Sequence, residues 1–132
     1  MGIIDLCIQL KPLQEDWEPA YEDRIYAVES NHIGYVVDPF MVKKNRDILF
    51  YCPSAVQIVD RIKEEELKGA WEIARVQISR LNKPDSDQFE SVLIRAYALK
   101  KYNMVWKKGQ WEKLTIIQAL WAHLGGLIWT WK

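Results

Sequence analysis

The sequence contains few of the residues on which small secreted domains and metal-dependent proteins rely. Its 132 residues include two cysteines, Cys7 and Cys52, and two histidines, His32 and His123. Two cysteines do not make the disulfide framework of a small secreted domain. Neither histidine has another ligand at metal-binding spacing. We therefore expect no disulfide framework, no metal and no other cofactor.

Glycine is also scarce, with six residues, of which Gly125 and Gly126 are adjacent. The sequence has no glycine-rich phosphate loop, dinucleotide-binding fingerprint or nucleophile elbow. The N-terminal residues include no basic segment, and Asp5 interrupts their apolar run, so they do not have the pattern of a secretory signal. We therefore expect a cytoplasmic protein, and we favour a binding protein over an enzyme.

Hydrophobic side chains, by contrast, make up 49% of the sequence, which is enough for one packed domain over residues 1–132. Seven residues are tryptophan. Residues 114–131 carry no charge, and this length is the lower limit for a helix that spans a membrane. Because the two adjacent glycines would interrupt such a helix, we expect a buried helix that ends at Gly125, followed by a short strand from Leu127. Membrane contact is not expected.

Residues 1–52 show the patterns of β-strands. In residues 4–10 every second side chain is apolar, which is typical of a half-buried strand. Residues 24–29 and 33–37 are two further runs, and the short polar turn between them predicts a hairpin. Residues 47–52 have the mostly apolar composition of a central strand. The sequence therefore predicts a mainly antiparallel sheet of about four strands.

Residues 53–132 show the caps and the periodicity of helices. Two capping boxes, in which a glutamine follows the capping residue by three positions, begin at Ser54 and Asp85. Gly69 predicts a break between two helices. We expect three to four helices here, packed against the N-terminal sheet in an α+β fold.

The net charge of zero conceals two halves of opposite sign. Residues 1–60 have five basic and ten acidic residues, whereas residues 61–132 have thirteen basic and eight acidic residues. In the second half, lysine and arginine alternate with aromatic rings, as in proteins that bind single-stranded nucleic acid. The candidate nucleic-acid contacts are Arg95, Lys100, Lys101, Tyr102, Trp106, Lys107, Lys108 and Lys113. Tyr102 and Trp106 are the expected stacking rings, and a solvated basic face is the alternative interpretation.

The acidic half contains a loop, residues 15–23, with five carboxylates around two aromatic rings. Aromatic rings are common anchors of protein interfaces, and carboxylates favour a basic partner. The candidate partner contacts in this loop and in the C-terminal tail are Trp17, Glu18, Tyr21, Glu22, Trp129 and Trp131.

Cys52 is the one candidate for catalysis, because it lies between a predicted strand and a predicted helix. A helix N-terminus stabilises a thiolate. This order of strand, cysteine, proline and helix resembles the junction of thioredoxin-like proteins, but Ala55 occupies the place of their second thiol. A buried, inert thiol is the interpretation we favour.

Three hypotheses about function follow from these patterns. The first is a non-catalytic protein-interaction module, such as an accessory subunit, an inhibitor or an immunity-type protein, which binds a protein partner or another copy of itself. The second is nucleic-acid binding through the basic and aromatic segment 95–113. The third is a thiol-dependent enzyme that uses Cys52.

Overall fold

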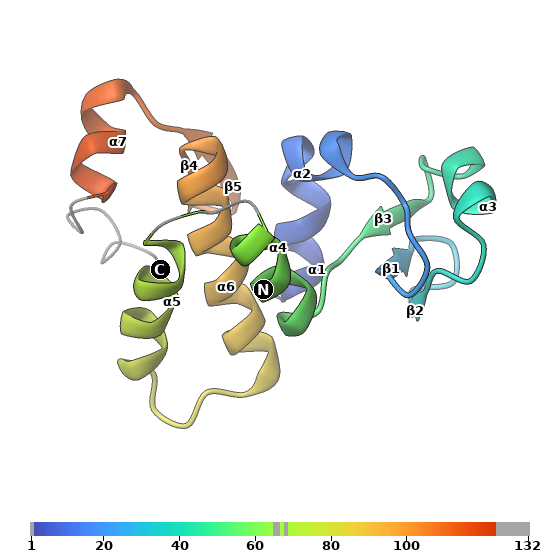
Figure 1. The fold of residues 1–132 in the computed structure, drawn as a ribbon, viewed down its shortest axis with the longest axis horizontal. Coiled ribbons are helices and arrows are strands. Elements are labelled where there is room, and N and C mark those ends of the chain that lie inside the picture. The colour runs from blue at the N-terminus through green and yellow to red at the C-terminus, as the bar shows by residue number, and fades with distance from the viewer. Residues whose placement is uncertain (1, 65–66, 68, 124–132) are drawn as a thin grey trace.

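The computed structural model describes residues 2–64, 67 and 69–123. Within these residues the chain forms seven helices and five strands (Figure 1). The helices are α1 (Ile3–Gln9), α2 (Lys11–Asp16), α3 (Pro39–Lys44), α4 (Ala55–Glu64), α5 (Ala70–Ser79), α6 (Ser86–Tyr102) and α7 (Ile116–His123). The strands are β1 (Arg24–Ala27), β2 (His32–Tyr35), β3 (Leu49–Tyr51), β4 (Met104–Lys107) and β5 (Gln110–Lys113). The predicted α+β class is therefore confirmed.

The N-terminal segment is a helix, so the prediction of a strand over residues 4–10 is wrong. The buried side chains are spaced three and four residues apart, at Ile3, Leu6, Cys7 and Leu10. This spacing is the period of an α-helix. Ile4 and Ile8 are partly buried as well, so the helix is apolar on more than one side. In so short a segment, this wide apolar surface also produces an alternating pattern.

The first sheet contains the predicted hairpin and, within residues 47–52, the strand β3, which lies at the edge of this three-stranded sheet and not at its centre as expected. Its strand order is β2-β1-β3, with β1 antiparallel to both neighbours. Arg24 lies opposite Tyr35 in the hairpin. Within the described residues this sheet has three strands instead of about four, because α1 replaces the first expected strand. The sheet packs on helices mainly through β3, which contacts α1 and α2. The expected packing of the sheet against the C-terminal helices is therefore wrong.

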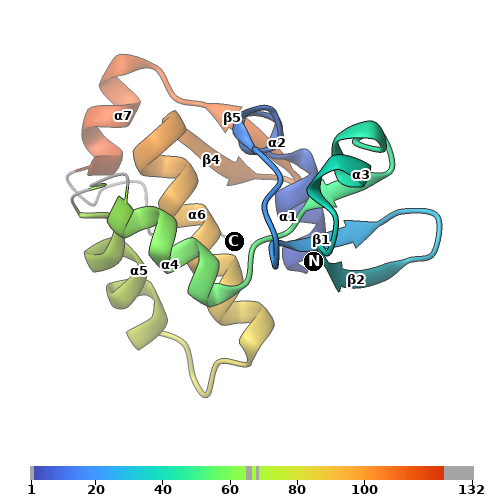
Figure 2. The same ribbon diagram turned by 45° about the vertical axis from the view of Figure 1, so that its right-hand side comes forward.

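The C-terminal helices are organised around α6, which contacts α1, α4, α5 and α7. Figure 2 shows α6 running through this part of the molecule with α4 and α5 beside it. Both predicted capping boxes are confirmed. The Asp85 side chain accepts from the Gln88 backbone N–H at 2.8 Å, and the Ser54 hydroxyl accepts from the Gln57 backbone N–H at 3.3 Å.

A second hairpin, β4–β5, lies between α6 and α7 and was not predicted. Trp106 lies opposite Trp111, and their rings contact edge to face at 5.3 Å. The turn uses Lys108 and Gly109, both with positive φ, as tight hairpin turns require. The Trp111 indole donates to the Leu6 carbonyl at 2.9 Å, which fastens this hairpin to α1.

The last described helix, α7, is mostly exposed and not buried as expected. The exposed apolar side chains are Ile116, Ile117, Leu120 and Trp121. Ala122 is the fully buried residue of the helix. The expected helix end at Gly125, the short strand from Leu127 and the residues Trp129 and Trp131 lie outside the described residues. None of the described helices is long and apolar enough to cross a membrane.

Gly69 forms the predicted break before α5 and adopts a left-handed conformation, with φ of 86°. We expect Gly69→Ala to lower the free energy of unfolding by about 1 kcal/mol, because a Cβ atom strains this conformation. Urea denaturation measures the loss. The control is Gly34→Ala, where an added Cβ meets no atom within 4 Å. If the free energy of unfolding falls equally in both variants, the left-handed backbone at Gly69 is not the cause of the loss.

Candidate functional site

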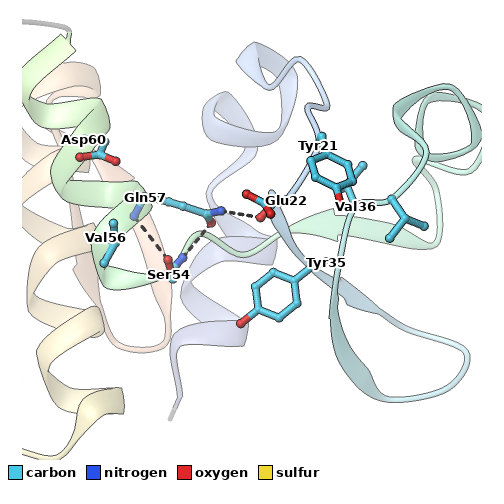
Figure 3. Close-up of a pocket in the computed structure, with 9 residues that line it drawn as sticks. Tyr21, Glu22, Tyr35, Val36, Ser54, Val56, Gln57 and Asp60 are labelled. Atoms are coloured by element: carbon cyan, nitrogen blue, oxygen red, sulfur yellow. Dashed lines mark hydrogen bonds between the residues drawn. The ribbon is translucent and has the colours of Figure 1, made fainter.

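A cleft of about 630 Å³ lies between α4 and the segments that flank β1 and β2. Figure 3 shows it open between these two walls. Its aromatic and apolar lining includes Tyr21, Tyr35, Val37 and Val56. Its two carboxylates are Glu22 and Asp60, and none of the described lining residues is basic. The cleft is therefore both aromatic and acidic.

A single amide, that of Gln57, joins the two walls (Figure 3). Its nitrogen donates to the Glu22 carbonyl at 2.8 Å on the opposite wall. Its oxygen accepts from the Arg24 backbone N–H at 3.2 Å and from the Ser54 backbone N–H at 3.1 Å. The same residue thus completes the capping box of α4 and fixes α4 against the beginning of β1.

Trp17 supports this region from the core and does not line the cleft. Its side chain is buried, and its ring stacks on that of Tyr51 at 5.0 Å and an angle of 5°. Its indole N–H donates to Asp23 at 2.9 Å, and the same carboxylate oxygen accepts from the Ala20 backbone N–H. The expectation that Trp17 is an exposed anchor is therefore wrong. Its ring instead orders the acidic loop.

The other candidates in the acidic loop are exposed. Tyr21 and Glu22 line the cleft. Glu18 forms an ion pair of 3.4 Å with Lys43 and lies outside the cleft lining. The sequence reasoning missed Tyr35 and Asp60, which complete the cleft from β2 and α4. The available signals were an aromatic residue in the middle of the predicted strand 33–37 and an acidic residue in the helix predicted to begin at Ser54, but neither signal indicates that the two residues meet.

The candidate nucleic-acid contacts do not present the expected stacking rings. Trp106 is buried against Trp111. Tyr102 is half-buried, and its hydroxyl donates to Asp16 at 2.8 Å. Burial also raises the pKa of Tyr102 above its usual value.

The basic residues of this group differ in their surroundings. Arg95 is partly buried on α6, and this burial lowers the pKa of its guanidinium. Lys101 lies 5.9 Å from the centre of the Tyr102 ring, and Lys100 is also partly buried. On the β4–β5 hairpin, Lys107 is partly buried, and Lys108 and Lys113 are exposed. Of the candidate contacts, the exposed positive charges are therefore those of Lys108 and Lys113 on the hairpin, and neither Tyr102 nor Trp106 places an exposed ring beside them.

Cys52 is fully buried, and so is Cys7. The hydrogen bond with Cys7 and the charge of Arg24 lower the pKa of the Cys52 thiol below its usual value, against the opposing effect of burial. The Arg24 guanidinium lies 3.9 Å from the Cys52 sulfur and donates to the Cys52 carbonyl at 2.7 Å. Arg24 in turn forms a largely buried ion pair with Glu90. The Cys52 sulfur is thus buried from solvent and lies beside a positive charge.

Among the described residues, no three histidine, cysteine, aspartate or glutamate side chains form a group that could hold a metal ion. Among the described residues, we take the aromatic and acidic cleft as the candidate binding site. Comparison of the chain with protein-family models, with curated proteins and with solved structures found no match.

Proposed function

We propose that the protein is a non-catalytic interaction module whose cleft binds a basic segment of a partner protein. The observation that carries this proposal is the presence of two carboxylates and two tyrosine rings around one hollow that has no basic lining residue. A lysine or arginine side chain matches this chemistry. It forms ion pairs with the carboxylates, and its charge is attracted to the face of a tyrosine ring.

The exposure of the cleft residues supports a role in binding instead of folding. Tyr21 is 66% exposed, Val37 80% and Val56 69%. Burial of apolar surface contributes about 25 cal/mol per Å², and these side chains do not gain it within the folded chain. A partner that covers them supplies that burial, as at the centres of protein interfaces.

The position of β2 favours an extended partner segment. Within the described residues β2 is an outer strand of its sheet, and Tyr35 is its last residue. An outer strand offers backbone donors and acceptors to an added chain. An extended segment that pairs with β2 places alternate side chains on one face, close to the cleft at the end of this strand.

The test uses two fluorescein-labelled peptides of equal length, one alternating arginine with valine and one alternating glutamate with valine. We expect the basic peptide to bind in a fluorescence anisotropy titration at low ionic strength, and the acidic peptide not to bind. In the variant Glu22→Gln/Asp60→Asn, we expect the affinity for the basic peptide to fall about tenfold, because two attractive charges are lost.

The matched control is Glu72→Gln, which removes one exposed carboxylate on α5, away from the cleft. It should leave the affinity within about twofold, because screened charges outside a contact contribute little. Equal binding of both peptides, no binding of the basic peptide, or equal loss in the cleft and control variants contradicts the proposal. A single-stranded oligonucleotide that binds more tightly than the basic peptide favours the nucleic-acid hypothesis instead.

A further inference from the structure

Two cysteines that are 45 positions apart in the sequence come together in the core. Cys7 belongs to α1, and Cys52 directly follows β3. Both are free thiols and both are fully buried, and the pKa of each is shifted by the other, as expected for neighbouring side chains. Their separation in the sequence gives no sign of this proximity.

The backbone around the two thiols is held by the side chain of Gln14. Its amide nitrogen donates to the Cys7 carbonyl at 3.0 Å and to the Tyr51 carbonyl at 2.7 Å. Its amide oxygen accepts from the Tyr51 backbone N–H at 2.8 Å. Because Tyr51 is the neighbour of Cys52, these three hydrogen bonds fix the approach of α1 to the end of β3. The contact between the thiols is therefore part of the packing of the fold.

The two thiols have different electrostatic surroundings. Arg24 places its guanidinium against Cys52 and also donates to the Pro53 carbonyl at 3.1 Å. A buried cation beside a thiol stabilises the thiolate, which is the nucleophilic form. Burial, in contrast, raises the pKa of the Cys7 thiol well above its usual value. Cys52 thus has the properties of an attacking thiol, and Cys7 those of a thiol that reacts second.

We propose that Cys7 and Cys52 are a redox site that hydrogen peroxide converts to an intramolecular disulfide. The Cys52 sulfur attacks one peroxide oxygen and breaks the O–O bond. The other oxygen leaves as water with the thiol proton, and Cys52 becomes a sulfenic acid. The Cys7 sulfur then attacks the Cys52 sulfur and expels the second water. In total, two thiols lose two electrons and two protons, and one peroxide becomes two waters.

The burial of both sulfurs limits the size of an oxidant that can reach them. Thiol–disulfide exchange requires a second sulfur compound to approach in contact with the attacked sulfur. Glutathione disulfide and protein disulfides are too large to enter this packed region. Hydrogen peroxide is small and uncharged, so it reaches the thiols through local opening of the core.

The test treats the reduced, folded protein with a modest excess of hydrogen peroxide and follows its intact mass. We expect the loss of two hydrogen atoms, recovery of the original mass with dithiothreitol, and one Cys7–Cys52 linked peptide in a non-reducing digest. The disulfide should also raise the Tm by about 5 °C or more, because it closes a long loop in the unfolded chain.

The variant Cys7→Ala provides the matched control, after circular dichroism has verified its fold. It removes the thiol that reacts second, so the sulfenic acid on Cys52 should persist, and dimedone should label it once urea has unfolded the oxidised protein. If this variant does not fold, the measurement on the wild-type protein alone tests the proposal. The proposal is overturned if both thiols of the folded wild-type protein stay reduced while the urea-unfolded protein is oxidised. It is also overturned if disulfides form only between molecules, or if Cys52 is oxidised to a sulfinic acid without a disulfide.

Discussion

The variant Glu90→Ala should lower the free energy of unfolding by about 3–5 kcal/mol, because it leaves a buried guanidinium without its counter-charge. The side chains of Arg24 and Glu90 are only 12% and 11% exposed. Arg24 Nη1 lies 3.3 Å from Glu90 Oε1, and Nη2 contacts the other oxygen. The pair also connects β1 to α6, so its loss affects both halves of the fold. Urea-induced unfolding followed by tryptophan fluorescence measures this change.

The exposed pair of Glu72 and Arg75 on α5, with an N–O distance of 2.7 Å, is the matched control. Glu72→Ala should cost less than about 1 kcal/mol, because an exposed ion pair gains little over solvated charges. The double variant Arg24→Met/Glu90→Leu should recover most of the stability lost in Glu90→Ala, since no charge stays buried alone. If Glu90→Ala costs no more than Glu72→Ala, the buried ion pair does not stabilise the fold.

The second large effect is expected for Trp17→Ala, which should destabilise the protein by about 3–5 kcal/mol. The substitution removes the ring that stacks on Tyr51 and leaves a cavity in the core. It also removes the hydrogen bond to Asp23, which orders the acidic loop. Because the variant lacks one of the fluorescent residues, circular dichroism is the suitable measure of unfolding.

Two further variants separate the contributions of Trp17. Trp17→Phe keeps an aromatic ring on Tyr51 and loses the indole donor, so its stability should lie between those of the wild type and Trp17→Ala. Trp71→Ala removes an indole that is 43% exposed, and should cost about 1 kcal/mol or less. A similar loss for Trp71→Ala and Trp17→Ala would mean that the burial of Trp17 does not determine its contribution.

The local signals in the sequence predicted those elements whose boundaries depend on neighbouring residues. The capping boxes at Ser54 and Asp85 marked the beginnings of α4 and α6, and Gly69 marked the break before α5. The polar turn between β1 and β2 marked the first hairpin. In each case, the physical cause lies within a few residues of the element, so a sequence pattern can report it.

The errors arose where tertiary packing decides the outcome. In α1, seven residues were too few to distinguish a broad apolar helix from an alternating strand. For the residues of the β4–β5 hairpin the sequence predicts a basic and aromatic surface. It does not show that Trp106 and Trp111 face each other. Trp17 was assigned to the surface because of its acidic neighbours, although its ring packs on Tyr51.

The candidate cleft was predicted only in part, for the same reason. Tyr21 and Glu22 were selected from the composition of one loop. Tyr35 and Asp60 come from β2 and α4, and these elements meet the loop only in the folded chain. No pattern within one segment of the sequence contains this arrangement.

The position of the Gln57 amide also has a thermodynamic consequence for association. Since this side chain already holds both walls of the cleft, the proposed binding of a partner segment would cost the backbone of the protein little conformational freedom at this site. The entropic cost of ordering then falls mainly on the incoming segment. A partner segment that is already extended before it binds would therefore associate more favourably than a flexible one of the same composition.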